Sequence, residues 1–307
     1  GVEKDLATSI EWLTKSARQG QMYAEEMLGD SYIKGWGVKR DYAEALRLFK
    51  SAAAKGNPWA FNNLGSMYRY GRGVPRDPVE ALAQYRIGAE KGNPAAQNNL
   101  ADMYRLGDGV ERNPGQALFW AQKSSDQSYG WGRNQLGILY RDGIGVEPDI
   151  SKAIEAFKTA TQLRDPPYAF AITAFSNLAR IYYDGFAVQP DLEEALKWAE
   201  EGVKLNEPTA MATLANILAS EKRKGTPPEL QRAFELANRA VELNSVIGKI
   251  TLGRFYLEGI GVAPDPEYAL KLFLQARDAG SVDALVEIGH CYRDGKGVQK
   301  DAEQARQ

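Results

Sequence analysis

Apolar side chains recur every four residues along this chain, in pairs of short runs separated by a glycine-rich turn. In one pair, Ala60, Leu64 and Tyr68 form the first run, and the same spacing extends from Ala81 to Ala89 in the second. Side chains four residues apart share one face of an α-helix. We therefore predict two short helices in each stretch, and the small residues at fixed places allow the paired helices to pack closely.

The turn between the two runs is a Gly-X-Gly-Val sequence that returns at a nearly constant spacing. Most successive copies are 36 residues apart. A fixed period of this length is typical of solenoids, in which each supersecondary unit packs only on its neighbours. We therefore predict one elongated domain over residues 1–307. The first glycines of the copies, the fifth of which begins the variant Gly-Phe-Ala-Val, are Gly35, Gly71, Gly107, Gly143, Gly185, Gly259 and Gly295.

The glycine register also sets the bounds of the units and shows two places where the period breaks. Six residues are inserted at 166–171, and the unit at 208–245 has the charged run Glu221–Gly225 in place of the glycine turn. We favour the interpretation that both breaks change only the curvature of the array. The alternative is that they form a hinge or a surface for a particular partner. Partial units at 1–21 and 282–307 lead us to expect a longer parent protein. The remaining units are 22–57, 58–93, 94–129, 130–165, 172–207 and 246–281.

Residues at the expected helix ends agree with this pattern. A glycine that ends the first helix adopts a left-handed conformation without steric penalty. An aspartate or asparagine before the second helix accepts hydrogen bonds from its first free amides. Proline often follows this acceptor, as in Asp77-Pro78, at a helix position where its missing N–H is not needed. A glutamate three residues after the acceptor predicts reciprocal capping boxes at Asp41/Glu44, Asp77/Glu80, Asp191/Glu194 and Thr226/Glu229.

The unit resembles the Sel1-like repeat, a relative of the tetratricopeptide repeat, in its Ala60, Leu64, Gly65 and Tyr68 positions, its glycine turn and the aspartate that follows. The resemblance covers essentially the whole chain, although the unit at 208–245 is closer to a plain tetratricopeptide repeat. It implies an all-α fold, a right-handed superhelical solenoid of antiparallel helix pairs with about eight units. The family's tryptophan position is taken by Trp12, Trp120 and Trp198.

Composition narrows the classes of partner and of chemistry. The net charge of -2 and the sequence pI ≈ 5.8 give no basic surface for nucleic acid. No apolar run approaches the ~20 residues that span a bilayer, so we expect no direct membrane insertion. The single Cys291 forms no internal disulfide. Compartment stays open, with an exported or periplasmic bacterial location slightly favoured by the family resemblance alone.

The sequence offers little for catalysis or cofactors. His290 and Cys291 are the only residues of their kinds, and neighbours in a helix do not face each other, so they form no dyad and no metal site. The Gly-X-Gly-Val turns follow helices, whereas a dinucleotide-binding loop follows a strand and has a third glycine. We therefore predict no catalytic residue, no metal and no cofactor.

The resemblance places the first helix of each pair on the concave side of the array. Packing uses the positions of Ala60, Leu64, Gly65 and Tyr68, so the positions between them face a groove. An amide, a guanidinium and an aromatic side chain recur there in successive units. The predicted partner-binding residues are Tyr23, Trp59, Asn62, Arg69, Asn98, Arg105, Trp131, Asn134 and Arg141.

The chemistry of these residues suits an extended protein segment. An asparagine amide matches the donor and acceptor of one peptide unit, an arginine binds carboxylates bidentately, and aromatics supply contact area. The alternative is that repeat duplication left these residues in place, with the arginines solvated or paired with local acids such as Asp142. The asparagines one residue further on are structural in this interpretation, at Asn63, Asn99 and Asn177.

These observations favour a non-enzymatic scaffold or adaptor module whose concave groove binds a segment of a partner protein. The alternative is a regulatory or sensor domain of a larger protein whose catalytic or membrane-anchored part lies outside this sequence. A third hypothesis is self-association of the array into a structural assembly. An enzyme in its own right is the least favoured.

Overall fold

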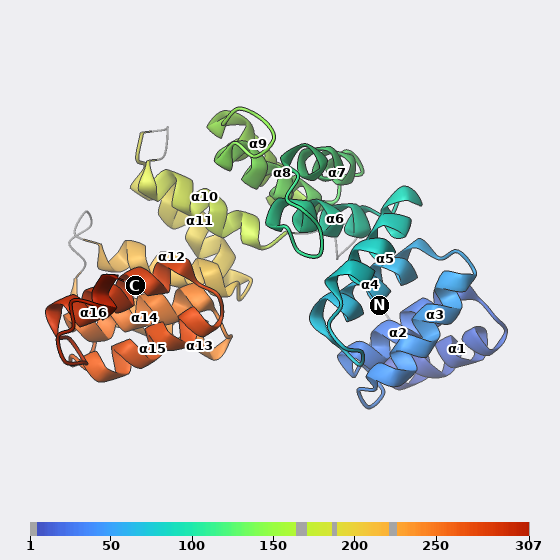
Figure 1. The fold of residues 1–307 in the computed structure, drawn as a ribbon, viewed down its shortest axis with the longest axis horizontal. Coiled ribbons are helices and arrows are strands. Elements are labelled where there is room, and N and C mark those ends of the chain that lie inside the picture. Colours follow the sequence, from blue (N-terminus) through green and yellow to red (C-terminus); the bar gives the residue numbers. More distant parts are fainter. Residues whose placement is uncertain (1–4, 164–170, 186–188, 221–225, 307) are drawn as a thin grey trace. The chain divides into compact units, whose positions relative to one another are not determined.

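The computed structural model describes residues 5–163, 171–185, 189–220 and 226–306, and every regular element within these ranges is helical (Figure 1). This confirms the predicted all-α array of helix pairs. The first helices of the pairs are α2 (Met22–Lys34), α4 (Pro58–Tyr70), α6 (Pro94–Leu106), α8 (Gly130–Asp142), α10 (Thr173–Asp184), α12 (Pro208–Ala219), α14 (Val246–Glu258) and α16 (Val282–Asp294). The second helices are α1 (Leu6–Arg18), α3 (Tyr42–Ala54), α5 (Pro78–Glu90), α7 (Pro114–Asp126), α9 (Ile150–Gln162), α11 (Leu192–Lys204), α13 (Pro227–Glu242) and α15 (Pro266–Asp278), followed by a short 3-10 helix, η1 (Gln304–Arg306).

The helices form two compact units, Gly1–Ala171 and Ile172–Gln307. The first unit contains α1 to α9 and the second contains α10 to η1. The boundary falls at the predicted insertion, of which residues 166–170 lie outside the described residues, as does the charged run Glu221–Gly225. The array over residues 1–307 as a single domain stays a prediction.

Local residues close each helix pair as the sequence predicts. Gly71 ends α4 in the left-handed region with φ 65, and its N–H donates to the carbonyl of Met67. The Asp77 N–H then donates to the Tyr68 carbonyl at 2.9 Å, and the Asp77 carboxylate caps α5 by accepting from the N–H of Val79 and Glu80. The same tyrosine-to-cap bond recurs in the other repeats that keep the glycine turn.

The capping boxes form only in part. Among the described residues, Thr226 and Glu229 form the reciprocal box, with the Thr226 N–H donating to the Glu229 carboxylate at 2.9 Å. In the three aspartate boxes the aspartate caps its helix, but the glutamate bonds further along it, as Glu80 does with Gln84. The reciprocal half predicted for these three is therefore wrong, because the N–H of each capping aspartate already donates to the carbonyl of the tyrosine before the turn.

Small residues let the two helices of a pair approach closely. Gly65 of α4 lies against the ring of Tyr85 of α5, where an added Cβ would come within 2.6 Å of the ring. Ala60 and Ala81 beside this contact are fully buried. Glycine in the first helix and an aromatic residue in the second are therefore the two halves of one packing contact.

The second glycine of the turn packs one repeat on the repeat before it. A Cβ at Gly73 would lie 2.6 Å from the Cβ of Tyr42, which begins the second helix of the preceding repeat. Gly109 approaches the backbone of Pro78 in the same way. The spacing of the Gly-X-Gly-Val turns therefore follows from contact between repeats as well as from the turn itself.

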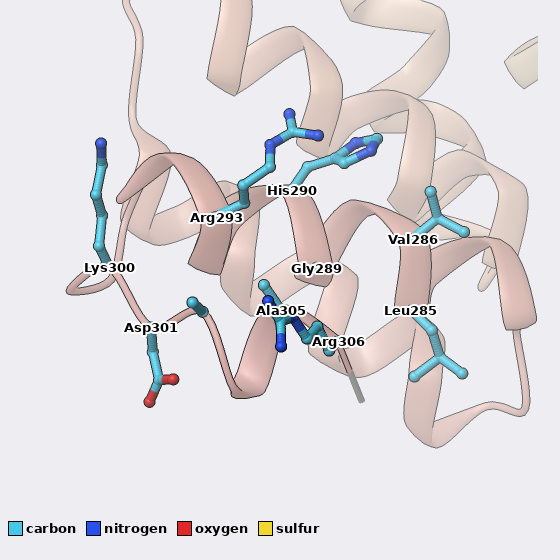
Figure 2. A pocket seen from close by; sticks show the side chains of 10 residues that line it. Leu285, Val286, Gly289, His290, Arg293, Lys300, Asp301, Ala305 and Arg306 are labelled. Atoms are coloured by element: carbon cyan, nitrogen blue, oxygen red, sulfur yellow. The ribbon is translucent and has the colours of Figure 1, made fainter.

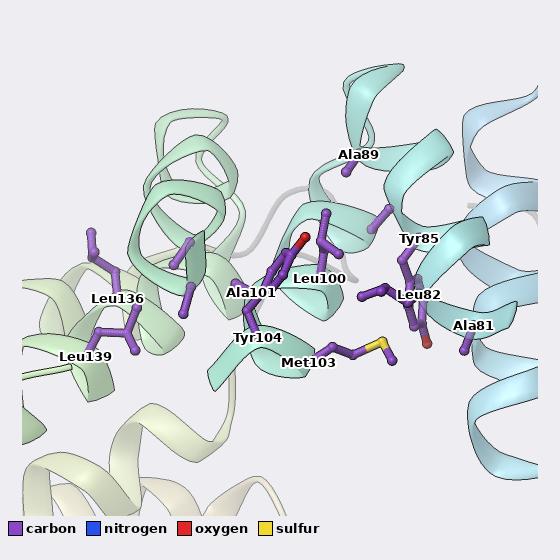
Figure 3. Packing of buried hydrophobic residues seen from close by; sticks show 13 residues of the cluster. Ala81, Leu82, Tyr85, Ala89, Leu100, Ala101, Met103, Tyr104, Leu136 and Leu139 are labelled. Carbon is purple, nitrogen blue, oxygen red and sulfur yellow. The ribbon is translucent and has the colours of Figure 1, made fainter. Parts of the chain in front are cut away.

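The apolar core continues across repeats instead of closing within each one. In the first unit, Tyr85, Leu100, Tyr104, Leu136 and Leu139 belong to one buried cluster that runs from α5 to α8 (Figure 3). In the second unit, a comparable cluster joins residues of α10 to α15. Each helix pair thus needs its neighbours to bury its apolar faces, as expected of a solenoid.

Candidate partner-binding surfaces on the first helices

Within each unit, successive first helices contact one another directly, as α6 contacts α8 and α10 contacts α12. Consecutive second helices have no comparable contact in the part of the chain that the structure describes. The first helices therefore lie on the inner side of the curve in each unit, in agreement with the family resemblance. We call the face of these helices that points away from the second helices the inner surface.

The nine predicted residues all lie on first helices of the first unit, and they divide into three groups by their exposure. Tyr23 is exposed, at 55%. Asn62, Arg69 and Asn134 are buried, at 8%, 7% and 6% exposure. The expectation that these three face an open groove is therefore wrong for the protein alone. The half-buried members of the set are Trp59, Asn98, Arg105, Trp131 and Arg141.

Asn62 is buried because it links two repeats. Its Oδ1 accepts from the Nδ2 of Asn99 at 2.9 Å, and in the preceding repeat Asn63 Nδ2 donates to the Oε1 of Glu26 at 2.8 Å. These bonds support the interpretation of Asn63 and Asn99 as structural.

The equivalent hydrogen bond between the next two repeats, from Gln135 to Asn98, does not form in the described part of the chain. Asn98 Oδ1 and Gln135 Nε2, which replaces the asparagine amide there, are shielded from solvent and have no hydrogen-bond partner among the described residues.

Arg69 is the centre of an ion-pair network between α4 and α6. Its Nη2 lies 2.7 Å from Asp102 and its Nε 3.0 Å from Asp108. Arg105 and Arg76 bind the same two acids, at 2.6 Å and 2.7 Å. Burial lowers the pKa of Arg69, but the hydrogen bond and charge of Asp102 outweigh it and hold that pKa above its usual value.

The alternative in which the arginines pair with local acids is therefore confirmed for several of them. Arg141 pairs with Asp142 at 2.6 Å, and Arg105 with Asp102. Both of these acids lie on the same helix as their arginine. Arg69 reaches Asp102 of the next repeat because successive first helices are in close contact.

One carboxyl group on the first helix α2 has a raised pKa. Burial, and then the negative charge of Asp30, raise the pKa of Glu26 to about 7, while the hydrogen bond from Asn63 opposes the shift. Glu26 occupies the repeat position of Asn62, so an acid stands where later repeats have a neutral amide.

The second unit has a groove that the sequence analysis did not single out. It has a volume of about 330 Å³ and is lined by α10, α12 and α14 with the first turn of α16. Its lining includes Arg180, Thr213, Asn216, Thr251 and Arg254. We call this cavity the inner groove. The repeat register could have predicted this groove, because Arg180, Asn216 and Arg254 occupy the same position in three consecutive repeats.

The family of the repeats is settled by comparison with known sequences. The model described as the Sel1 repeat matches nine segments of this chain, which together cover most of it. The chain belongs to the Sel1 repeat family. The matched segments are 1–21, 23–57, 62–93, 94–129, 132–165, 176–207, 208–245, 252–281 and 282–307.

Two solved structures are similar to this chain in both sequence and fold. One is a protective antigen with an SLR fold, present in uropathogenic Escherichia coli strains; it is 28% identical, and the match covers 99% of this chain and 71% of that chain with a TM-score of 0.53. Another is a Sel1 repeat protein from Oxalobacter formigenes, 26% identical, with 76% of this chain and 99% of that chain covered and a TM-score of 0.62. No curated protein matches the chain.

Sel1 repeats generally act as protein–protein interaction modules and are typically non-catalytic scaffolds. Cys291 is buried, at 1% exposure, and burial raises the pKa of its thiol, whereas the His290 side chain is 48% exposed. Within the described ranges, no His, Cys, Asp and Glu side chains gather as a set of three that could bind a metal, and no helix there has the length and hydropathy to cross a membrane.

A larger hollow of about 740 Å³ beside α16 is a packing surface of the Sel1 repeat (Figure 2). Its floor is Gly289, which faces the backbone of Ala305. The equivalent Gly253 packs against the ring of Phe273 in the helix that follows. The hollow therefore corresponds to the site of a helix–helix contact, and we assign it no ligand.

Proposed function

We propose that this chain is a protein-interaction module whose inner surfaces bind extended segments of a partner protein. The inner groove of the second unit carries the proposal, because it combines a concave shape with polar groups whose bonding capacity is unused. Asn216 donates from Nδ2 to Thr251 at 3.0 Å and keeps its carbonyl oxygen as an acceptor. A peptide backbone presents alternating donors and acceptors that such groups can bind.

The inner surface of the first unit provides a second contact area in this proposal. Tyr23 is exposed and Trp59 and Trp131 are half-buried, and aromatic side chains supply much of the binding energy in protein interfaces. Asn98 and Arg105 lie between them in the repeat order. The buried Asn62 and Arg69 act by holding these repeats in register.

Selection of short random peptides displayed on phage, against the whole chain, tests the proposal. Synthetic copies of the enriched peptides, carrying a photo-crosslinker, should crosslink to α10, α12 and α14. Ile247 lines the groove and is half-buried, so Ile247→Glu should block binding. Tyr268 lies on the second helix α15 and is exposed, so Tyr268→Glu is the matched control and should bind normally.

Two results would contradict the proposal. One is the absence of any enriched peptide. The other is crosslinking confined to the second helices, with Ile247→Glu and Tyr268→Glu binding equally well. Circular dichroism of both variants checks that the helices are intact.

A further inference from the structure

We infer that the segment bound in the inner groove is acidic, and that Arg180 and Arg254 bind its carboxylate side chains. The inference rests on the proposed function, because it names the chemistry of the segment that the groove takes. Its basis is the charge of one column of residues on the first helices of the second unit.

Arg180 is an exposed arginine on the rim of the groove. It makes no hydrogen bond and no ion pair within the ranges that the structure describes. A guanidinium has five N–H donors in a planar fork that matches a carboxylate. Arg180 therefore has its whole donor set available to a ligand.

The reason for this availability lies in the repeat register. Arg69 pairs with Asp102 and Arg254 with Glu287, each acid being 33 residues further along the chain. This separation is one repeat less about one helical turn, and it places the two side chains on neighbouring first helices. The corresponding residue for Arg180 is Thr213, which carries no charge to neutralise it.

Arg254 is only partly satisfied by its own acid. Its Nε and Nη2 both donate to the same oxygen of Glu287, at 2.9 Å and 2.6 Å. The Arg254 side chain remains 44% exposed, with Nη1 outside this contact. One edge of the guanidinium is therefore open to a second carboxylate.

The same column offers no arginine in the first unit. The positions of Arg180, Asn216 and Arg254 are held there by Asp30, Ser66 and Asp102. Asp30 pairs with Lys34, and Asp102 pairs with Arg69 and Arg105, so both acids are already neutralised and this column has no group for a carboxylate. The acidic ligand therefore belongs to the second unit.

The spacing of the column sets the spacing of the acids in the ligand. Packed helices lie about 8–10 Å apart, and two such steps separate α10 from α14. An extended chain advances about 3.3 Å per residue, so it covers this span in about five or six residues. We therefore expect two Asp or Glu residues about four to six positions apart, because flexible arginine side chains shorten the span.

Two acidic residues at the ends of the groove restrict where these carboxylates lie. Asp184 is in the last turn of α10 and Asp283 in the first turn of α16. Both are exposed and neither is ion-paired among the described residues. They repel anionic groups at the margins, so the acidic side chains of the segment are confined to the arginine column and its flanks favour basic or neutral residues.

The test uses the peptides enriched by phage display on the whole chain. They should carry paired Asp or Glu residues, and Arg180→Gln should weaken their binding about tenfold, as expected for loss of a charge-assisted hydrogen bond. Replacing the peptide acids with Asn or Gln should weaken binding to a similar degree, and combining both changes should add little. The matched control is Arg239→Gln on α13, where the arginine is also exposed, at 54%, and where affinity should not change.

The outcomes separate this inference from the proposed function. Peptides that crosslink to the inner groove without acidic residues, or that bind Arg180→Gln and wild type equally, would overturn the inference and leave the proposed function standing. Peptides that do not crosslink to the groove at all would overturn both.

Discussion

Replacing Arg69 with alanine tests whether this residue stabilises the contact between two repeats or is available to bind a partner protein. The Arg69 side chain is 8% exposed and binds two acids. Breaking a buried ion pair costs about 3–5 kcal/mol when it leaves a charge unpaired. Here Asp102 keeps Arg105 and Asp108 keeps Arg76, so neither carboxylate is abandoned. We therefore expect Arg69→Ala to lower the free energy of unfolding by about 2–3 kcal/mol, below that range.

The chain offers a matched control at the same position of another first helix. Arg293 of α16 pairs with Asp294 at 2.7 Å, but its side chain is 61% exposed. Solvent screens an exposed pair of this kind, so it adds little to stability. Arg293→Ala should therefore leave the free energy of unfolding almost unchanged.

Urea unfolding followed by helical circular dichroism measures both variants. Amide hydrogen exchange then locates the loss, which for Arg69→Ala should be concentrated in α4 and α6. Equal stability of Arg69→Ala and Arg293→Ala, or faster exchange spread evenly over the helices, would refute the structural role of Arg69. That result would instead support the prediction that Arg69 binds a partner protein.

Two further predictions concern Glu26 and the close helix contacts. Because the fold raises the pKa of Glu26 from 4.5 to about 7, the stability from its protonated form is present below pH 4.5 and lost as pH rises through 7. Glutamine stays neutral at every pH. Glu26→Gln should therefore raise the free energy of unfolding by about 2–3 kcal/mol at about pH 8 and hardly change it at about pH 4.5. Equal gains at both pH values in urea titrations would contradict this. Gly253→Ala should destabilise by about 1–3 kcal/mol because its methyl overlaps the buried Phe273 ring. Gly115 lies at an exposed position of α7, so Gly115→Ala should stabilise by up to about 1 kcal/mol. Similar melting temperatures for the two variants would contradict the packing argument.

The helix boundaries could be predicted from sequence because their causes are local. Gly71 ends α4 through its own left-handed conformation, and Asp77 caps α5 through amides two and three residues away. The apolar period similarly identified Ala60 and Ala81 as core residues, and both are fully buried. Such interactions need no knowledge of how far apart the repeats lie.

The burial of Asn62 and Arg69 could not be read from a single helix. Both occupy positions that point away from the second helix of their own pair, and on one helix such positions are open to solvent. Their partners, Asn99 and Asp102, belong to the next repeat. The distance between successive first helices, which only the structure supplies, decides whether these side chains face a groove or each other.

Once that distance is known, the repeat register predicts which side chains pair. Side chains separated by one repeat less a helical turn meet between neighbouring first helices, as Arg69 does with Asp102, and as Asn216 does with Thr251 across the slightly longer repeat that follows it. The same offset from Arg180 leads to an uncharged threonine. In the proposed function, this uncharged residue is what makes the second unit select an acidic segment, because an arginine with no acid at that offset has its N–H donors available to a carboxylate.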